Sequence, residues 1–472
     1  MRDYPKFYID GAWLEPATAN IQLAINPATE QTCGKISHGS STDVNRAAAV
    51  ASQAFRSYSR TSIPQRVELL QSIAAEYERR LTDIADAITE EMGAPRSLAY
   101  QAQAPAGLAQ FANAIATLKN FSFEERRGRT IIRKEPIGVC GLITPWNWPA
   151  MMVACKVAPA LATGCTAVLK PSEMAPFSAQ IIAEVLHSAG VPAGVFNLVQ
   201  GTGAEVGAAI SAHPHIRMVS FTGSVRAGIE ITRAAAATVK RVCLELGGKS
   251  PHIILEDANM AEAATVAVNS VMRNSGQTCA AATRTLIPRG RSEEFLAAAV
   301  KLVEGMSVGD PLTDAQLGPV ASRAQWKRVQ GYIQSGIREG ARLVIGGPGL
   351  PEHINQGCFV RPTIFANVRP GMTIAREEIF GPVMSVIEYT TVEDAIAISN
   401  DSPYGLHARV SGSDTEQMRQ VAVQIEAGQV VFNNAPADLN APFGGCKESG
   451  NGREWGDYGF NEFLELKAII GC

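Results

Sequence analysis

The sequence predicts an α/β protein with two tandem open α/β domains. At 472 residues the chain is too long for one simple core, which favours two or three domains. Short apolar runs bounded by turn residues alternate with stretches of helical periodicity, a pattern typical of parallel sheets with helical crossovers. A second series of the same kind begins after Ser250, so each series predicts its own sheet.

The elements follow in order along the chain. Apolar residues at helical spacing predict amphipathic helices over residues 44–54 and 65–92. The first series predicts strands at 139–143, 166–169 and 217–221, with helices at 178–189 and 204–212. The second series predicts strands at 252–255, 285–287, 383–389 and 429–432. Residues 120–135 are polar and charged and predict an exposed hairpin, since charge on an edge strand is a common protection against aggregation.

Composition excludes several classes of protein. Hydrophobic residues make up 46% of the chain and charged residues 18%, which fits a soluble globular protein. A net charge of −3 gives no reason to expect binding to nucleic acid or to an anionic membrane. Nine cysteines without CxxC pairs argue against a disulfide framework and a zinc site, so no metal is expected. With no signal-like apolar stretch at the start, we expect a cytoplasmic protein.

Cys279 lies in a setting that suits a nucleophile. It follows Gly, Gln and Thr and precedes alanines, so the backbone can approach a ligand and the sulfur stays uncrowded. Glu245, followed by two glycines, is a plausible base for a later hydrolytic step. On these two segments alone, a packed cysteine and a surface glutamate remain an alternative.

Seven motifs in order resemble those of the NAD(P)-dependent aldehyde dehydrogenase superfamily, in its hydrolytic, non-acylating type. Any one is weak, but the set runs through nearly the whole chain and is specific. The motifs are 145–149 (Pro-Trp-Asn-Trp-Pro), 170–173 (Lys-Pro-Ser-Glu), 221–224 (Phe-Thr-Gly-Ser), 244–249 (Leu-Glu-Leu-Gly-Gly-Lys), 276–279 (Gly-Gln-Thr-Cys), 377–382 (Glu-Glu-Ile-Phe-Gly-Pro) and 442–445 (Pro-Phe-Gly-Gly).

The resemblance implies a catalytic set. Cys279 would attack the aldehyde, Glu245 would activate water, and the Asn147 amide with the Cys279 backbone N–H would form an oxyanion hole. Without the family, an asparagine between two tryptophans would more often be a turn residue. Lys156 and Glu454 match residues suspected of relaying protons, although each could equally be half of an ordinary salt bridge.

The resemblance also implies a cofactor site for NAD. Glu173 would bind the ribose hydroxyls and repel the 2′-phosphate of NADP, which leaves NADP as the less favoured alternative. The glycine run at 201–207 has one residue too many for a true GxGxxG fingerprint, yet with residues 221–224 it suits a phosphate-facing surface. The implied cofactor contacts are Ile143, Trp146, Lys170, Ser172, Glu173, Gly203, Gly207, Phe221, Gly223, Ser224, Leu246, Glu378 and Phe380.

The implied substrate tunnel contains Trp148, Met152, Cys155, Arg273, Thr278 and Phe443. Its large apolar members favour a medium-size apolar or aromatic aldehyde, or a semialdehyde. Arg273 could bind an anionic or polar far end of the substrate, or it could pair with an acid or lie at the tunnel mouth. Since Cys155 stands where a second arginine would complete a carboxylate clamp, a short dicarboxylic semialdehyde is not favoured.

The resemblance divides the chain into parts and implies a homodimer or homotetramer. Residues 1–117 and 137–247 would form the Rossmann-like NAD-binding domain, 248–447 the catalytic domain, 118–136 and 461–472 a small β oligomerisation arm, and 448–460 a segment returning to the cofactor domain. The sequence argues against two alternatives to the hydrolytic enzyme. A CoA-acylating relative would lack the glutamate at position 245, and a non-catalytic relative would be expected to lack Cys279, Asn147 or Glu245; all three are present.

Overall fold

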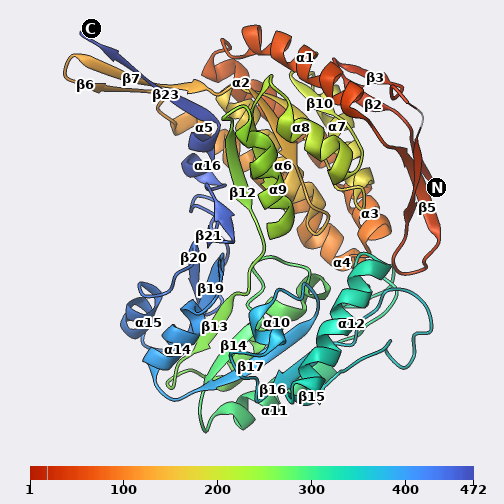
Figure 1. Cartoon of the computed structure of the whole chain (residues 1–472), viewed down its shortest axis with the longest axis vertical. Coiled ribbons are helices and arrows are strands. Elements are labelled where there is room, and N and C mark those ends of the chain that lie inside the picture. The colour runs from red at the N-terminus through yellow and green to blue at the C-terminus, as the bar shows by residue number, and fades with distance from the viewer. Residues whose placement is uncertain (19) are drawn as a thin grey trace.

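The computed structural model describes residues 1–18 and 20–472. Its two large sheets occupy the upper and lower halves of Figure 1, and the chain passes from the first to the second after β12. The prediction of a mixed α/β fold with two sheets is confirmed.

The first sheet has the order β22-β12-β11-β8-β9-β10-β2-β3. Its five central strands, from β12 to β10, run parallel, and the strands at the two edges are antiparallel to their neighbours. The parallel strands are β8 (Val139–Ile143), β9 (Thr166–Lys170), β10 (Phe196–Leu198), β11 (Ile216–Thr222) and β12 (Arg241–Glu245); the edge strands are β2 (Phe7–Ile9), β3 (Ala12–Leu14) and β22 (Gly450–Asn451). The three strands predicted in this series are therefore present.

The helices of this half are α1 (Ser41–Tyr58), α2 (Ile63–Arg79), α3 (Leu81–Met92), α4 (Arg96–Leu98), α5 (Ala104–Asn120), α6 (Pro149–Thr163), α7 (Pro176–Ser188), α8 (Ala208–Ala212) and α9 (Val225–Ala236). The prediction of a continuous helix over 65–92 is wrong. Arg80 leaves helical geometry (φ −101°, ψ 9°), which lets α2 pack mainly on α5 while α3 packs mainly on α7. The predicted helix at 204–212 begins as a π-turn over Gly203–Gly207 before α8.

The second sheet has the order β15-β16-β17-β14-β13-β19-β20, with every pair parallel except β15 and β16. Its strands are β13 (Pro251–Ile254), β14 (Arg284–Pro288), β15 (Arg342–Ile345), β16 (Thr363–Ala366), β17 (Val383–Tyr389), β19 (His407–Ser411) and β20 (Gln429–Phe432). Its helices are α10 (Met260–Met272), α11 (Ser292–Glu304), α12 (Arg323–Arg338), α13 (Thr373–Arg376), α14 (Val392–Asn400) and α15 (Thr415–Ala422). All four strands predicted here are present.

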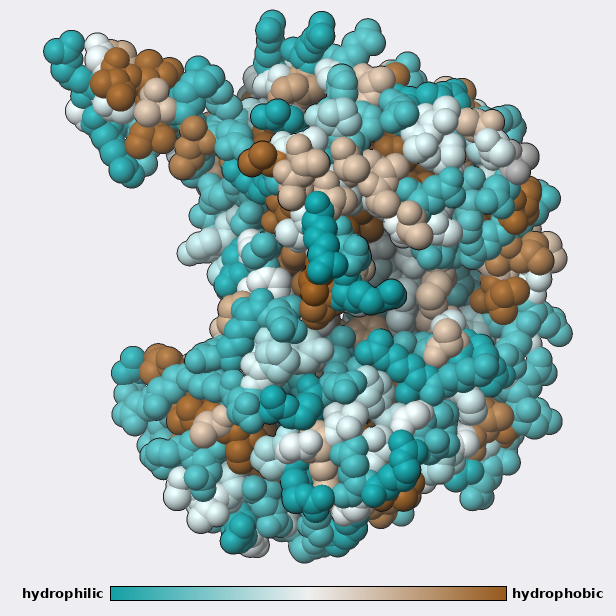
Figure 2. Space-filling model, viewed as in Figure 1, coloured by the Kyte–Doolittle hydropathy of each residue, from teal (hydrophilic) through white to brown (hydrophobic). Residues whose placement is uncertain are grey.

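A three-stranded arm projects from the first half (Figure 1). It consists of β6 (Glu124–Arg127), β7 (Thr130–Pro136) and β23 (Leu464–Ile470), which confirms the exposed hairpin. Because α5 continues to Asn120 and α16 (Gly456–Glu462) precedes β23, the strands begin later than the expected boundaries at 118 and 461. Figure 2 shows apolar side chains gathered on this arm, where Leu466 is 72% and Ile470 81% exposed.

The remaining strands form two small sheets. β4 (Ile21–Ile25), β5 (Thr32–Ser37) and β1 (Arg2–Tyr4) make a three-stranded sheet, and β18 (Tyr404–Gly405) pairs with β21 (Cys446–Lys447). Among the described residues, no helix is both long enough and apolar enough to cross a membrane.

Four parallel strands of the first sheet end at the same edge. β8 leads into Trp146 and Asn147, β9 into Glu173, β11 into Ser224, and β12 ends at Glu245. The carboxyl edge of an open parallel sheet is where such folds bind ligands, so this topology directs the motif residues to one place.

Candidate active site

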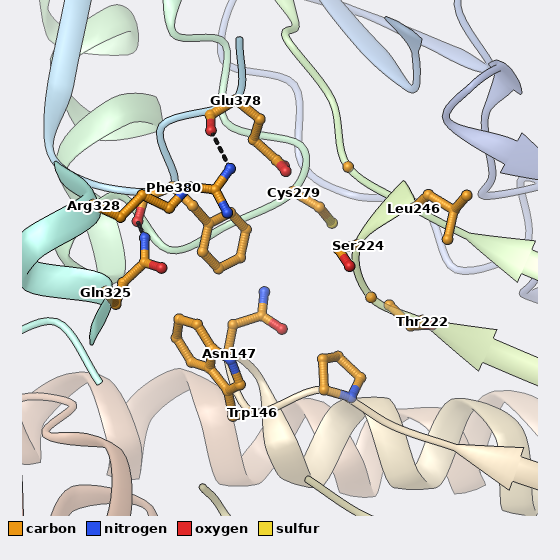
Figure 3. A pocket seen from close by; sticks show the side chains of 13 residues that line it. Trp146, Asn147, Thr222, Ser224, Leu246, Cys279, Gln325, Arg328, Glu378 and Phe380 are labelled. Atoms are coloured by element: carbon orange, nitrogen blue, oxygen red, sulfur yellow. Dashed lines mark hydrogen bonds between the residues drawn. The ribbon is translucent and has the colours of Figure 1, made fainter. Parts of the chain in front are cut away.

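A cavity of about 160 Å³ gathers residues from both halves of the molecule (Figure 3). The first half contributes the loop after β8, the end of β11 and the residues after β12, while the second contributes Cys279, α12 and the segment before β17. Its lining residues are Pro145, Trp146, Asn147, Thr222, Gly223, Ser224, Leu246, Gly247, Cys279, Gln325, Arg328, Glu378 and Phe380. The sequence predicts eight of these as site residues.

The loop that carries Cys279 is held in an unusual conformation. Asn274, Ser275 and Gly276 have φ of 56°, 53° and 76°, in the left-handed region that side chains disfavour. Gly276 is needed here because a Cβ at this position would lie 2.0 Å from the carbonyl carbon of Gly381. The Asn274 amide donates to the carbonyl oxygens of Asn147 (2.9 Å) and Gln277 (3.2 Å), which ties the loop to the first half.

Cys279 is half-buried at the cavity surface. Burial, together with the nearby carboxylates of Glu378 and Glu245, raises the pKa of its thiol to about 12. The thiol is therefore protonated at neutral pH, and forming the reactive thiolate requires a positive charge nearby or a group that removes the proton.

Glu245 ends β12 and is 2% exposed. Neither of its side-chain oxygens has a hydrogen-bond partner within the described chain. Burial raises the pKa of this carboxyl well above its usual range, and the Glu454 carboxylate adds to the shift. Gly444 lies directly against it, since a Cβ there would come within 2.5 Å of Oε1. A buried carboxyl with a raised pKa and free oxygens is well suited to general-base chemistry.

Asn147 is buried and points its side chain into the cavity on the side facing Cys279 (Figure 3). Its Nδ2 donates to the carbonyl oxygen of Gln277 at 3.1 Å, which uses one of the two amide hydrogens. The other hydrogen is available for an oxyanion.

Lys156 and Glu454 form a single buried ion pair rather than two separate ones. Lys156 Nζ also donates to Ser220 Oγ at 3.0 Å, and Cys155 Sγ donates to Glu454 Oε2 at 3.5 Å. Because the charge of Glu454 raises the pKa of Glu245, the pair lies within electrostatic range of that carboxyl. The structure is thus consistent with both roles considered for Lys156 and Glu454, half of a salt bridge and a proton relay near the base.

The segment from Glu378 to Phe380 closes one side of the cavity. Gly248 N–H donates to Glu378 Oε1 at 3.1 Å, and Gly247 has no room for a Cβ, which would lie 2.3 Å from Oε2. Phe380 has φ of 59° and packs edge-on against Trp146, with ring centroids 5.4 Å apart. Such backbone strain persists only where the surroundings impose it.

Two residues of α12 impose the strained conformation of Phe380, and neither of them was identified from the sequence. Gln325 donates to the Phe380 carbonyl oxygen at 2.8 Å, and Arg328 donates to the Glu378 carbonyl oxygen at 2.8 Å (Figure 3). They lie one helical turn apart on a helix that has no motif and looks like any amphipathic helix. Only the packing of α12 against this segment identifies them.

Comparison with known proteins agrees with this geometry. The profile of the aldehyde dehydrogenase family matches residues 13–469. The chain belongs to the aldehyde dehydrogenase family. A Pseudomonas protein named 3-succinoylsemialdehyde-pyridine dehydrogenase is 52% identical over 100% of this chain and 99% of its own length. The predictions of the family and of an oxidoreductase acting on aldehydes are confirmed.

Solved structures of the family are also similar to this chain in sequence and in fold. A mutant of aldehyde dehydrogenase C from Pseudomonas syringae, in complex with NAD+ and octanal, is 50% identical with a TM-score of 0.98, covering 99% of this chain and 96% of that one. An aldehyde dehydrogenase from Bartonella henselae is 44% identical with the same TM-score, covering 100% of both chains.

The remaining predicted cofactor residues do not line this cavity, and Glu173 lines a separate pocket with Met174 and Ser322. Lys170 Nζ and Glu173 Oε2 form an ion pair at 2.8 Å after β9. Ser172 is less available than expected, because it is buried and its Oγ accepts from the Met174 N–H at 3.2 Å. The buried side chains of Ile143 and Phe221 pack together with Leu246 below the surface.

The glycines differ in their surroundings. A Cβ at Gly203 would meet nothing within 4 Å, so the backbone there is open to a ligand. A Cβ at Gly207 would only reach ordinary contact with Ile143, whereas one at Gly223 would lie 2.3 Å from the Phe221 ring. Ser224 is exposed and caps α9, accepting from the Ala227 N–H at 3.3 Å.

The predicted tunnel residues form one cluster. Trp148, Met152 and Cys155 pack together, and Trp148 Nε1 donates to Thr278 Oγ1 at 3.1 Å. The exposed Arg273 stacks its guanidinium 5.3 Å from the centroid of the Trp148 ring. Phe443 joins the cluster through Trp455, a residue not predicted from the sequence, whose ring stacks on Phe443 at 4.5 Å.

Arg273 forms no ion pair within residues 1–18 and 20–472. Its exposure agrees with a place at the rim of the cluster.

Proposed function

We propose that Cys279, Glu245 and Asn147 carry out the NAD-dependent oxidation of an aldehyde to its carboxylic acid, with water as the acyl acceptor. The observation that carries this proposal is Glu245, a buried carboxyl beside a cysteine-bearing cavity, with a raised pKa and both oxygens unpartnered. A buried carboxyl with a raised pKa and free oxygens can activate water. Cleavage of the thioester by CoA does not need an activated water.

The chain's own residues act in sequence. The Cys279 sulfur, as thiolate, adds to the aldehyde carbon and forms a thiohemiacetal, while the Asn147 amide and the Cys279 N–H donate to the oxygen. NAD, when bound, accepts the hydride from that carbon. The product on Cys279 is a thioester. Glu245 takes a proton from water, which attacks the thioester carbon and releases the acid together with the free Cys279 sulfur.

The site fits a dinucleotide. Thr222 Oγ1 is buried at the cavity and lacks a partner within the described chain, and Gly203 leaves its backbone open for a phosphate. Glu378 and Phe380 would hold the nicotinamide ribose and ring beside Trp146, and Ser224 at the start of α9 would face the pyrophosphate. Lys170 and Glu173 would bind the adenosine ribose.

The assay for this function is absorbance from NADH formed with a panel of aldehydes, with and without CoA. NADH formation and carboxylic acid product without CoA support the hydrolytic reaction. Turnover that depends on CoA, with an acyl-CoA product, would favour the acylating alternative.

Glu173 predicts a preference for NAD over NADP. Burial opposes its ionisation, but the Lys170 ammonium lowers the pKa of Glu173, so it carries a charge that repels a 2′-phosphate. Glu173→Ser is expected to raise kcat/KM for NADP relative to NAD. Glu256→Ser, on an exposed side chain outside the predicted site, serves as a control for removal of a surface charge. Equal use of both cofactors by the wild type would refute this role of Glu173.

Two names of similar proteins bear on the substrate. One relative is named for a pyridine-bearing semialdehyde, and one structure contains octanal. Both agree with the apolar cluster around Trp148, so we propose a medium-size apolar or aromatic aldehyde, or a longer semialdehyde, for this chain.

Arg273 supports a further prediction on the far end of that substrate. A guanidinium at the rim that forms no ion pair within the described residues can donate a charge-assisted hydrogen bond to an anionic group. Arg273→Leu is expected to lower kcat/KM selectively for a carboxylate-bearing aldehyde, by roughly 1.5–3 kcal/mol, compared with a neutral aldehyde of similar length. Equal losses on both aldehydes would remove Arg273 from the specificity of the enzyme.

The division into parts is also proposed. The sheet of residues 1–117 and 137–247 would hold the cofactor, with β22 of the segment 448–460 added at its edge, and residues 248–447 would hold the nucleophile. The exposed apolar side chains on the arm of residues 118–136 and 461–472 support a homodimer or homotetramer joined there. Nine free cysteines support a reducing compartment, the cytoplasm.

A further inference from the structure

A π-turn over Ala99–Gln103 joins α4 to α5. The Ala104 N–H donates to the Ala99 carbonyl oxygen, five residues earlier, which is the hydrogen bond that defines such a turn. Pro105 accounts for the wider turn, because it has no N–H and its ring would crowd the carbonyl group of Gln101 in a regular α-helix. Single π-turns are rare in helices and occur frequently at functional sites.

Gln103, the last residue of this turn, is completely buried. Its Nε2 donates to Asn274 Oδ1 at 2.9 Å. The bond joins the first half of the molecule to the loop that carries Cys279, 171 positions further along the chain. Gln103 Oε1 makes no hydrogen bond within the described residues, so the bond to Asn274 is the one polar contact that this side chain makes there.

The side-chain amide of Asn274 has one orientation that satisfies its neighbours. Its Nδ2 donates to the backbone carbonyl oxygens of Asn147 and Gln277, which can only accept. Oδ1 therefore faces Gln103, whose Nε2 is the donor that the described residues offer to it. Without that donor Asn274 would keep a buried, unpaired acceptor, and the amide would lose the contact that favours this orientation over others.

Asn274 in turn fixes Asn147 at two points. Its Nδ2 binds the Asn147 backbone directly, at 2.9 Å. It also shares the Gln277 carbonyl oxygen with Asn147 Nδ2, which donates to that oxygen at 3.1 Å. Both lone pairs of the Gln277 oxygen are then used. The direction of the Asn147 amide, and of the hydrogen that it leaves for the substrate oxygen, therefore depends on where Asn274 holds this carbonyl.

We propose that Gln103 is a positioning residue for the oxyanion hole and that it aligns the Asn147 amide through Asn274. The inference rests on the proposed function, in which Asn147 donates to the oxyanion. Donors stabilise an oxyanion when they already point at the place where its charge develops. A rotated Asn147 amide therefore lowers the rate although every group that contacts the substrate is still present. Gln103 does not line the cavity, so it acts through Asn274.

The test replaces Gln103 with methionine, which has nearly the same length but no N–H to donate. kcat/KM for NADH formation from hexanal should fall roughly tenfold, less than the roughly 10²–10³-fold expected when an oxyanion donor itself is removed. The KM for NAD should keep its wild-type value. In an Asn147→Ala background, Gln103→Met should cost less than about twofold, because the group that Gln103 aligns is already absent. Equal losses in the two backgrounds would overturn the inference.

Alkylation of Cys279 by iodoacetamide separates this role from a general disturbance of the loop. The thiolate sulfur forms a bond to the methylene carbon and iodide leaves, so no oxyanion develops and the Asn147 amide is not needed. The rate of alkylation, followed by mass spectrometry of the peptide that contains Cys279, should be the same in Gln103→Met as in the wild type. A rate that falls as much as kcat/KM for hexanal would overturn the inference.

Gln110→Met is the matched control, because Gln110 is also a buried glutamine, lies on α5 and has an Nε2 without a partner within the described residues. It should keep the wild-type kcat/KM. A loss equal to that of Gln103→Met would overturn the inference while the proposed function stands. If Gln103→Met does not fold, Gln103→Asn, which is one methylene too short to reach Asn274, should show the same selective loss, and wild-type kinetics in that variant would overturn the inference. A wild type that forms no NADH with hexanal or any other aldehyde of the panel would overturn the proposed function and the inference together.

Discussion

Replacing Cys279 with alanine is expected to abolish NADH formation and leave NAD binding nearly intact. The sulfur makes the only covalent bond to the substrate in the proposed reaction, whereas the cofactor would contact other residues of the cavity, such as Ser224 and Glu378. Turnover would be measured by NADH absorbance and binding by calorimetry.

Cys446→Ala provides the matched control for Cys279→Ala, since Cys446 is also half-buried but lies outside the cavity. It should retain wild-type turnover. Substantial NADH production by the Cys279 variant would eliminate the covalent mechanism, and loss of NAD affinity would mean that the substitution disturbs the cavity as a whole.

Glu245→Gln is expected to separate the two halves of the reaction. Hydride transfer should survive at least in part and give a burst of about one NADH per site, while hydrolysis slows by roughly 10²–10⁴-fold, the range for a lost general base. The amide nearly matches the carboxyl in shape, and no hydrogen bond of Glu245 within the described chain is lost, so the fold should persist.

The pH dependence of hydrolysis also tests the role of Glu245. Burial raises the pKa of Glu245, and the carboxylate is the basic form, so hydrolysis should increase as pH rises through that raised pKa. The glutamine variant should lose this increase. Glu448→Gln, on an exposed side chain, should keep both the rate and the pH profile. Unchanged steady turnover in Glu245→Gln would place the base elsewhere.

Much of this protein was predictable from local patterns. The strands β8, β11, β17 and β20 were expected within about a residue of their observed bounds, because buried parallel strands are continuous apolar runs between turn residues. The motifs also named most of the cavity, since glycines and polar residues at the carboxyl ends of strands report local backbone needs, as Gly276 and Gly247 do. The break at Arg80 was missed because both helices share one apolar periodicity.

The sequence by itself determined the family, the two α/β units and the chemical identities of Cys279, Glu245 and Asn147, since these depend on residue type and order. Only the tertiary structure shows which side chains hold the site in place. Gln325 and Arg328 act on Phe380 from a helix with no motif, and the charge of Glu454 reaches Glu245 across the fold. Hydrogen bonds, burial and charge act through space, so no local pattern records them.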